Sequence, residues 1–173
     1  MPTLILALLI LVGTWPNTQQ PAWKEFSSAE GKFSAIMPTD LKTSVIATDT
    51  AEGRLLTHTV STTDSDLSEY SVSWTEYPRE SLEQRMTESR FIKMRDALVG
   101  YKGGRVLNES VVSQEGHPAR DITFSTSEGR VVRVRFYSLK NRLYQVMAEA
   151  KEKDAVGVER FFNSFKLLPS TLV

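Results

Sequence analysis

The feature that most constrains the fold of this chain is the shortness of the turns between its predicted strands. In the second half, alternating apolar and polar residues predict four strands, at 105–114, 117–126, 130–139 and 143–150. The turns between them hold only two or three residues, at 115–116, 127–129 and 140–142. A parallel pair needs a long crossover connection, so these strands must pair antiparallel.

The first half of the chain has the same character. Segments rich in Val, Thr, Ser and aromatic residues predict five strands, at 23–26, 32–37, 42–48, 54–61 and 69–77. Turns are expected between the last three of these strands, at 49–53 and 62–68. With two helices added, the sequence predicts an α+β fold in which a twisted antiparallel sheet is flanked by two main helices.

The first helix is predicted at 82–99. Ser81 and Gln84 have the spacing of a capping box, in which each side chain satisfies a free backbone N–H group of the other residue. Glycines at the far end favour the left-handed conformation that closes a helix, and they stand at 100, 103 and 104.

The second helix is predicted from four apolar side chains at the spacing i, i+3, i+4 and i+7, which are Val158, Phe161, Phe162 and Phe165. Asp154 is the expected N-cap, and Pro169 is the expected end.

Matching side chains across two turns predicts the register of two hairpins. A three-residue loop at 127–129 places Asp121 opposite Arg135, together with the pairs Ile122–Val134 and Phe124–Val132. A three-residue loop at 140–142 places Arg133 opposite Glu149, together with the pairs Phe136–Val146 and Val134–Ala148. Both registers predict one apolar face and one face of paired charges.

Residues 1–20 are predicted to be a signal peptide that precedes a single domain at 21–173. The apolar run at 4–12 is too short for a membrane-spanning helix, which needs roughly 20 residues, but it fits the apolar core of a signal peptide. No Lys or Arg precedes the run, so a core element or a retained anchor remains an alternative. Export to a periplasm, a lumen or the extracellular space is expected, with membrane contact only through this segment if it is retained.

The composition excludes several classes of protein. Lys+Arg and Asp+Glu both number 21, which argues against a nucleic-acid partner because phosphate binding needs a basic excess. The chain has no cysteine, so it has no disulfide, no thiol nucleophile and no lipid-modified cysteine.

The sequence offers no catalytic, cofactor-binding or metal-ligating residues. His58 and His117 lack the short spacing of a metal site. Asp64 and Asp66 resemble part of a calcium loop, but the glycine and the distal glutamate of that loop are missing. No Gly-x-Ser-x-Gly nucleophile motif is present.

Two further segments have structural explanations. The glycine-rich loop at 100–104 follows a helix, whereas a phosphate-binding loop precedes one. A basic cluster in the last two predicted strands and the turn between them is expected to be largely neutralised by Asp121 and Glu149 across the sheet; it consists of Arg130, Arg133, Arg135, Lys140 and Arg142.

Four patches together resemble the PsbP-like superfamily. They are Trp23 with Phe26, Gly31, Phe33 and Pro38; Gly116-His117-Pro118-Ala119-Arg120; Asn141-Arg142-Leu143-Tyr144; and Phe161-Phe162-Asn163-Ser164-Phe165. The resemblance covers about 23–168 and implies an α/β/α sandwich shared with DcrB-type envelope proteins and a Ran-binding nuclear import factor. The resemblance assigns no site residues to this chain, because the members of the superfamily share no set of catalytic residues.

Members of this superfamily are mostly accessory, assembly or binding proteins of the thylakoid lumen or bacterial envelope rather than enzymes. The resemblance therefore implies an exported, non-catalytic protein that binds a protein partner and needs no cofactor. The functional surface is expected at one edge of the sheet or in the loop at 100–104, where Tyr101 is accessible. The alternatives are an enzyme with an unrecognised site and a small-ligand-binding protein.

Overall fold

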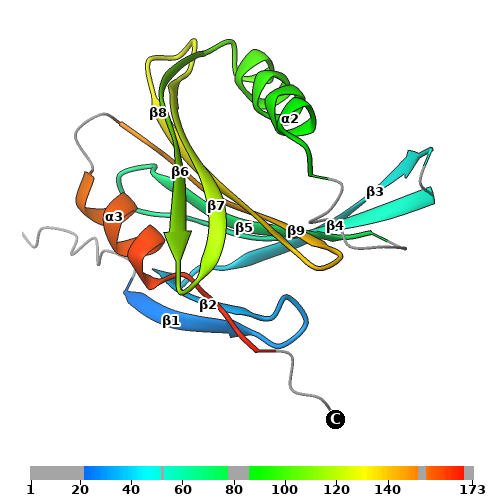
Figure 1. Cartoon of the computed structure of the whole chain (residues 1–173). Helices are drawn as coiled ribbons and strands as arrows, with labels where there is room; N and C mark the ends of the chain where they lie inside the picture. Colours follow the sequence, from blue (N-terminus) through cyan, green and yellow to red (C-terminus); the bar gives the residue numbers. More distant parts are fainter. Residues whose placement is uncertain (1–21, 52, 78–85, 152–154, 170–173) are drawn as a thin grey trace, which may run out of the picture.

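The described part of the chain forms two antiparallel sheets and two helices (Figure 1). The computed structural model describes residues 22–51, 53–77, 86–151 and 155–169. A seven-stranded sheet has the order β3-β4-β5-β9-β8-β7-β6, and a three-stranded sheet has the order β1-β2-β10. The expected α+β class is therefore correct. None of the helices in the described ranges is long and apolar enough to cross a membrane.

All nine predicted strands are present, with ends that differ by at most three residues. Their bounds are β1 Trp23–Ser28, β2 Phe33–Pro38, β3 Lys42–Thr50, β4 Gly53–Thr63, β5 Glu69–Glu76, β6 Arg105–Gln114, β7 His117–Ser125, β8 Val131–Leu139 and β9 Arg142–Ala150. A tenth strand, β10 (Lys166–Leu167), was not predicted, because two residues carry no readable alternation. It pairs antiparallel with β2.

Helix α2 spans Glu88–Tyr101 and begins later than predicted. Thr87 has extended backbone angles and is the N-cap, since its side chain accepts a hydrogen bond from the N–H group of Arg90. A continuous helix from residue 82 is therefore wrong. The predicted capping box at Ser81 and Gln84 lies outside the described residues.

The end of α2 is a Schellman motif. Gly103 has a φ of +58°, and the N–H group of Gly104 donates to the carbonyl of Val99 at 2.9 Å. A Cβ atom on Gly104 would lie 1.9 Å from the carbonyl oxygen of Ser125, so the close contact of this loop with β7 also requires glycine. The prediction that glycines close the helix is confirmed for Gly103 and Gly104, whereas Gly100 lies inside α2.

Helix α3 spans Ala155–Ser164 and ends before Pro169. The predicted N-cap, Asp154, lies outside the described residues. Phe161, Phe162 and Phe165 are buried, as the spacing predicted. Phe165 follows the helix and directly precedes β10, so the short strand rather than Pro169 ends the helical segment.

One predicted register is correct and the other is wrong. In the β7–β8 hairpin Asp121 lies opposite Arg135, as predicted. In the β8–β9 hairpin Arg133 lies opposite Ala148, and Val132 lies opposite Glu149. The turn holds two residues instead of three, and Lys140 adopts the positive φ of +53°.

The prediction of one apolar face and one charged face is also wrong. Both faces of the large sheet are covered by other elements, and each face carries an apolar core. Val132, Val134 and Phe136 form a core with α2 residues Phe91 and Val99. On the other face, alternate residues of β5, β8 and β9 form a second core with β2, α3 and Phe165; it contains Phe33, Tyr70, Val72, Trp74, Tyr137, Tyr144, Val146, Ala148, Phe161, Phe162 and Phe165.

Candidate functional site

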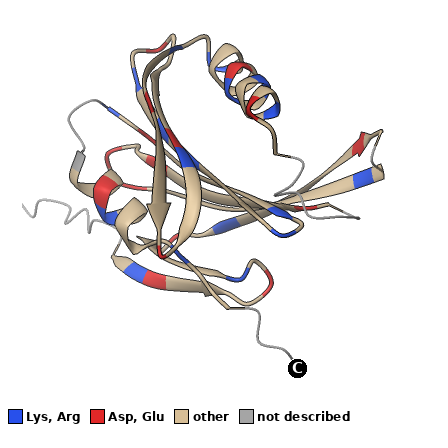
Figure 2. Ribbon diagram, in the orientation of Figure 1, with Lys and Arg blue, Asp and Glu red and all other residues tan. Residues whose placement is uncertain are grey.

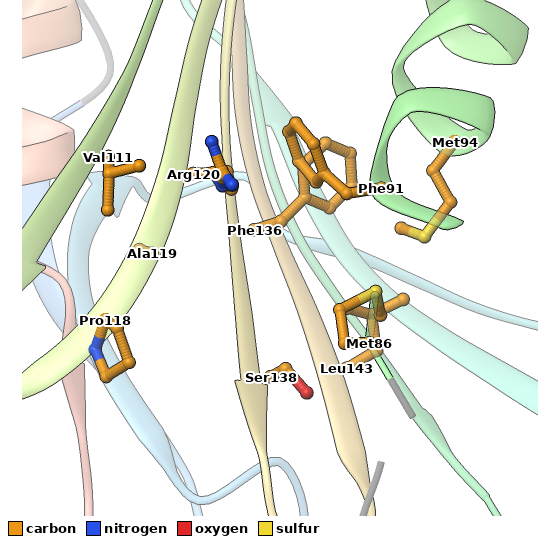
Figure 3. Close-up of a pocket in the computed structure, with 10 residues that line it drawn as sticks. All are labelled: Met86, Phe91, Met94, Val111, Pro118, Ala119, Arg120, Phe136, Ser138 and Leu143. Atoms are coloured by element: carbon orange, nitrogen blue, oxygen red, sulfur yellow. The ribbon is translucent and has the colours of Figure 1, made fainter. Parts of the chain in front are cut away.

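A groove lies between helix α2 and the face of the large sheet that it covers (Figure 3). It has a volume of about 200 Å³. Its lining is largely apolar and comes from α2 with the segment before it, and from β6 to β9: Met86, Phe91, Met94, Val111, Pro118, Ala119, Arg120, Phe136, Ser138 and Leu143. The rings of Phe91 and Phe136 meet edge to face, with their centroids 6.0 Å apart.

Two polar side chains break this apolar lining. The guanidinium group of Arg120 lies over the ring of Phe91, 5.0 Å from its centroid, and forms an ion pair with Glu88 at the start of α2. The hydroxyl group of Ser138 is buried and has no hydrogen-bond partner in the part of the chain that the structure describes. Such groups are rare in folded proteins, because an unpaired buried hydroxyl has lost its hydrogen bonds to water.

A second feature is the exposed edge of the sheet at β3. All nine residues of this strand are exposed, and Figure 1 shows β3 and β4 extending away from the rest of the molecule. Val45 and Ile46 expose 57% and 61% of their surface, and Leu56 on β4 is also exposed. Val45 lies opposite His58, and Ala47 lies opposite Leu56.

The four arginines of the predicted basic cluster are paired with carboxylates, although partly with partners other than those predicted. Arg133 and Arg135 both donate hydrogen bonds to Asp121. Glu149 pairs with Arg130 and with Lys102 at the end of α2, not with Arg133. Figure 2 shows blue and red segments interspersed along the ribbon.

Burial and hydrogen bonding set the pKa values of these groups. Burial alone would raise the pKa of Asp121, but hydrogen bonds from Arg133 and Arg135 outweigh it and hold the pKa below its ordinary value. The hydrogen bond to Glu149 raises the pKa of Lys102. These charges hold one another in place, and the contact of Lys102 with Glu149 fixes the end of α2 on the sheet.

The two histidines do not form a site together. His58 in β4 stacks on Trp74 with ring centroids 5.1 Å apart, and its Nδ1 atom lies 3.3 Å from Glu30. His117 begins β7, which three strands separate from β4 in the large sheet. Within the described residues, no cluster of histidine and carboxylate side chains could hold a metal ion.

The other candidate residues have structural roles. Asp64 accepts a hydrogen bond from the indole of Trp23, and Asp66 accepts two from Ser68, so both carboxylates order the loop after β4. The loop at 100–104 closes α2, and its Tyr101 is exposed.

The sequence alone did not identify the residues of the groove or the strand that forms the exposed edge. Phe91 and Met94 lie within the segment predicted as the first helix, but no motif marked Arg120 or Ser138 as site residues. Both residues line the groove because of the register in which β7 and β8 pair. The last pair of this hairpin is Ala119 with Tyr137, and the next position in the same register places Ser138 opposite Pro118.

Comparison with known proteins supports the fold. No protein-family model matches the sequence, and no curated protein matches it. The solution structure of cyanobacterial PsbP (CyanoP) from Synechocystis sp. PCC 6803 matches with a TM-score of 0.57 at 13% identity, covering 90% of this chain and 98% of that protein. A protein of unknown function from Pseudomonas aeruginosa matches with a TM-score of 0.41 at 10% identity, covering 79% of this chain and 88% of that protein.

The chain is thus an α+β protein with a PsbP-like fold, as the resemblance in its sequence predicted. At 13% identity the likeness extends to the fold alone.

Proposed function

We propose that this protein is an exported, non-catalytic accessory or assembly module that binds a partner protein by adding an extended strand to β3. The observation that carries this proposal is the edge of the sheet at β3: within the described residues no strand pairs with its outer side, and all nine of its residues are exposed. An edge strand offers unpaired backbone N–H and C=O groups to an incoming strand.

The composition of β3 favours this use. Natural edge strands are usually blunted by charges, proline or bulges, which prevent strand addition. β3 holds only Lys42 and Asp49 as charged residues, and its centre is Val45-Ile46-Ala47. Its pairing with β4 runs without a shift from Lys42 to Thr50, so the edge is regular.

The opposite edge, β6, has the protection that β3 lacks. Its pairing with β7 shifts between Val106 and Asn108. Glu109 in the middle of β6 forms an ion pair with Arg95 of α2, with 2.7 Å between the charged atoms. The two edges therefore differ in their suitability for a partner strand, although β6 also carries an exposed Val111.

A non-catalytic role agrees with how the buried charges are used. Asp121 and Glu149 are held by pairs of basic side chains, which keeps them in structural contacts rather than free to exchange protons with a substrate. A small-ligand-binding role is a second candidate, favoured by the apolar groove under α2. Nucleic acid is not a proposed partner, because the four arginines of the basic cluster are paired with carboxylates.

The strand-addition proposal is tested by replacing Ile46 with lysine, since a charge on the edge strand opposes pairing. Tagged wild-type protein and Ile46→Lys are purified from the native host, and the co-purified partner is quantified by mass spectrometry. We expect a loss of about tenfold or more, which corresponds to about 1.4 kcal/mol of binding free energy.

The matched control is Val156→Lys, which introduces the same charge at a residue of α3 that is 82% exposed. It should leave the recovery of the partner unchanged. Equal recovery with wild-type protein and Ile46→Lys would refute the role of β3.

Export is tested separately by the intact mass of protein purified from the native host. Residues 1–20 lie outside the described part of the chain, and their apolar run supports removal by signal peptidase. The expected mass lacks this segment. A mass that includes Met1 and the apolar run at 4–12 would contradict cleavage.

A further inference from the structure

The groove under α2 combines apolar walls with one basic side chain and one unpaired hydroxyl group. We propose that it binds a small amphipathic carboxylate, with the apolar body inside the groove and the carboxylate on Arg120. This inference develops the second candidate function, ligand binding, and does not depend on the strand addition proposed for β3.

The walls suit a flexible apolar body. Met86 and Met94 approach from the side of α2, while Phe136 and Leu143 lie on the sheet (Figure 3). Methionine side chains are unbranched and polarizable, so they adapt to ligands of irregular shape. Small-molecule sites typically combine such a lining with a few polar groups that fix orientation.

Arg120 is the basic side chain that can receive the carboxylate. Its ion-pair partner Glu88 has a side chain that is 57% exposed, and the Arg120 side chain itself is 31% exposed. Exposed pairs contribute little stability, so a ligand that also buries apolar surface can displace Glu88. A guanidinium group binds a carboxylate through two parallel hydrogen bonds, which suits this exchange.

Arg120 differs in this respect from the arginines on the opposite face of the sheet. Arg133 and Arg135 are held by Asp121, whose carboxylate is buried and accepts hydrogen bonds from both. Displacing Asp121 would leave a buried charge unpaired, whereas Glu88 can return to solvent. Arg133, which lines a second depression together with Asp121, is therefore not free to exchange its partner for a ligand.

Ser138 provides the second, independent observation. Its hydroxyl group lines the groove, is buried and has no hydrogen-bond partner among the described residues. Leaving such a group unsatisfied is unfavourable, and a polar atom of the ligand, or a water bound beside it, would offset this cost. Arg120 lies opposite Phe136 of β8, so the two side chains are on the same face of the sheet. Ser138 is two residues further along β8, so its side chain is on this face as well.

The inference is tested with decanoate as the probe, titrated below its micelle concentration into the full chain and followed by calorimetry. Arg120→Gln should weaken binding about tenfold or more, the order expected for loss of a charge-assisted hydrogen bond. Glu88→Gln should strengthen binding, because it removes the competing carboxylate. Decanol, which lacks the charge, should respond to neither substitution.

Arg160→Gln is the matched control, since this arginine lies on α3 and packs over Trp23 away from the groove. It should bind decanoate as the wild-type protein does, and thermal melts should show that each variant is folded. No saturable binding, or equal binding of decanoate by wild-type protein, Arg120→Gln and Glu88→Gln, would overturn the inference. The partner recovered through β3 would be unaffected by that result, so the two proposals fail independently.

Discussion

Replacing Asp121 with alanine should lower the free energy of unfolding by about 3–5 kcal/mol, because it leaves two guanidinium groups without their buried counter-charge. Asp121 is buried and accepts hydrogen bonds from the Nε atoms of Arg133 at 3.0 Å and Arg135 at 2.8 Å. Arg135 is itself buried between β7, β9 and α3, with its guanidinium group 5.2 Å from the ring centroid of Phe162. Chemical denaturation at neutral pH measures the change.

The control is Glu159→Gln, which removes another carboxylate from Arg133. Glu159 lies 2.7 Å from that guanidinium group, but its side chain is mostly exposed. An exposed pair contributes about 0–1 kcal/mol, so this variant should be nearly as stable as the wild-type protein. If both variants lost the same stability, burial of the Asp121 pair would not be the cause.

The stability lost in Asp121→Ala should depend on pH. Burial raises the pKa of Asp121, but the hydrogen bonds from Arg133 and Arg135 outweigh it, so the folded pKa lies below the ordinary value of 3.8. The stabilisation is therefore fully present above the unfolded pKa and is lost as the pH falls through the folded pKa. The difference in stability between wild-type protein and Asp121→Ala should be constant near neutral pH and should shrink in acid.

Replacing Phe161 with alanine should lower the free energy of unfolding by about 3–5 kcal/mol, the usual cost of deleting a buried aromatic ring. Phe161 is fully buried on α3. Its ring meets Tyr70 of β5 at 5.4 Å and Phe162 at 5.5 Å, both edge to face. The cavity would therefore lie between α3 and the large sheet, where the surrounding rings cannot close it.

Val156→Ala on the same helix is the control for this prediction. Val156 is almost fully exposed, so its truncation should change stability by no more than about 0.5 kcal/mol. Denaturant titrations of both variants give the comparison. Similar losses at Phe161 and Val156 would contradict the claim that burial of the Phe161 ring causes the loss, since alanine is the better helix former at both positions.

The order and pairing direction of the strands could be predicted because they follow from local patterns. The turn at 115–116 and the loop at 127–129 lie where the sequence placed them, and Asp121 lies opposite Arg135. Short turns leave antiparallel pairing as the only possibility, so these features did not depend on distant parts of the chain.

The register of β8 with β9 could not be predicted in the same way. Matching apolar residues assumed that only one face of the sheet is buried. In the structure Val134 faces α2, while Val146 and Ala148 face α3 and the smaller sheet. When both faces are covered, alternation no longer distinguishes two registers that differ by one residue.

The candidate sites depended on the same tertiary information. The exposure of Ile46 follows from the position of β3 at the end of the sheet, which local alternation does not reveal. Arg120 and Ser138 meet the apolar face of α2 only after β7 and β8 have paired. The sequence therefore indicated an accessible sheet edge without identifying which strand provides it.

The most direct test of strand addition at β3 is site-specific photo-crosslinking in the native host. A photo-reactive phenylalanine analogue in place of Ile46 should give a covalent product with a second protein, while the same analogue in place of Val156 should give none. The product is identified by mass spectrometry of the crosslinked band. Crosslinks from position 156 but not from position 46, or a product from position 46 that contains only two copies of this chain, would contradict the account.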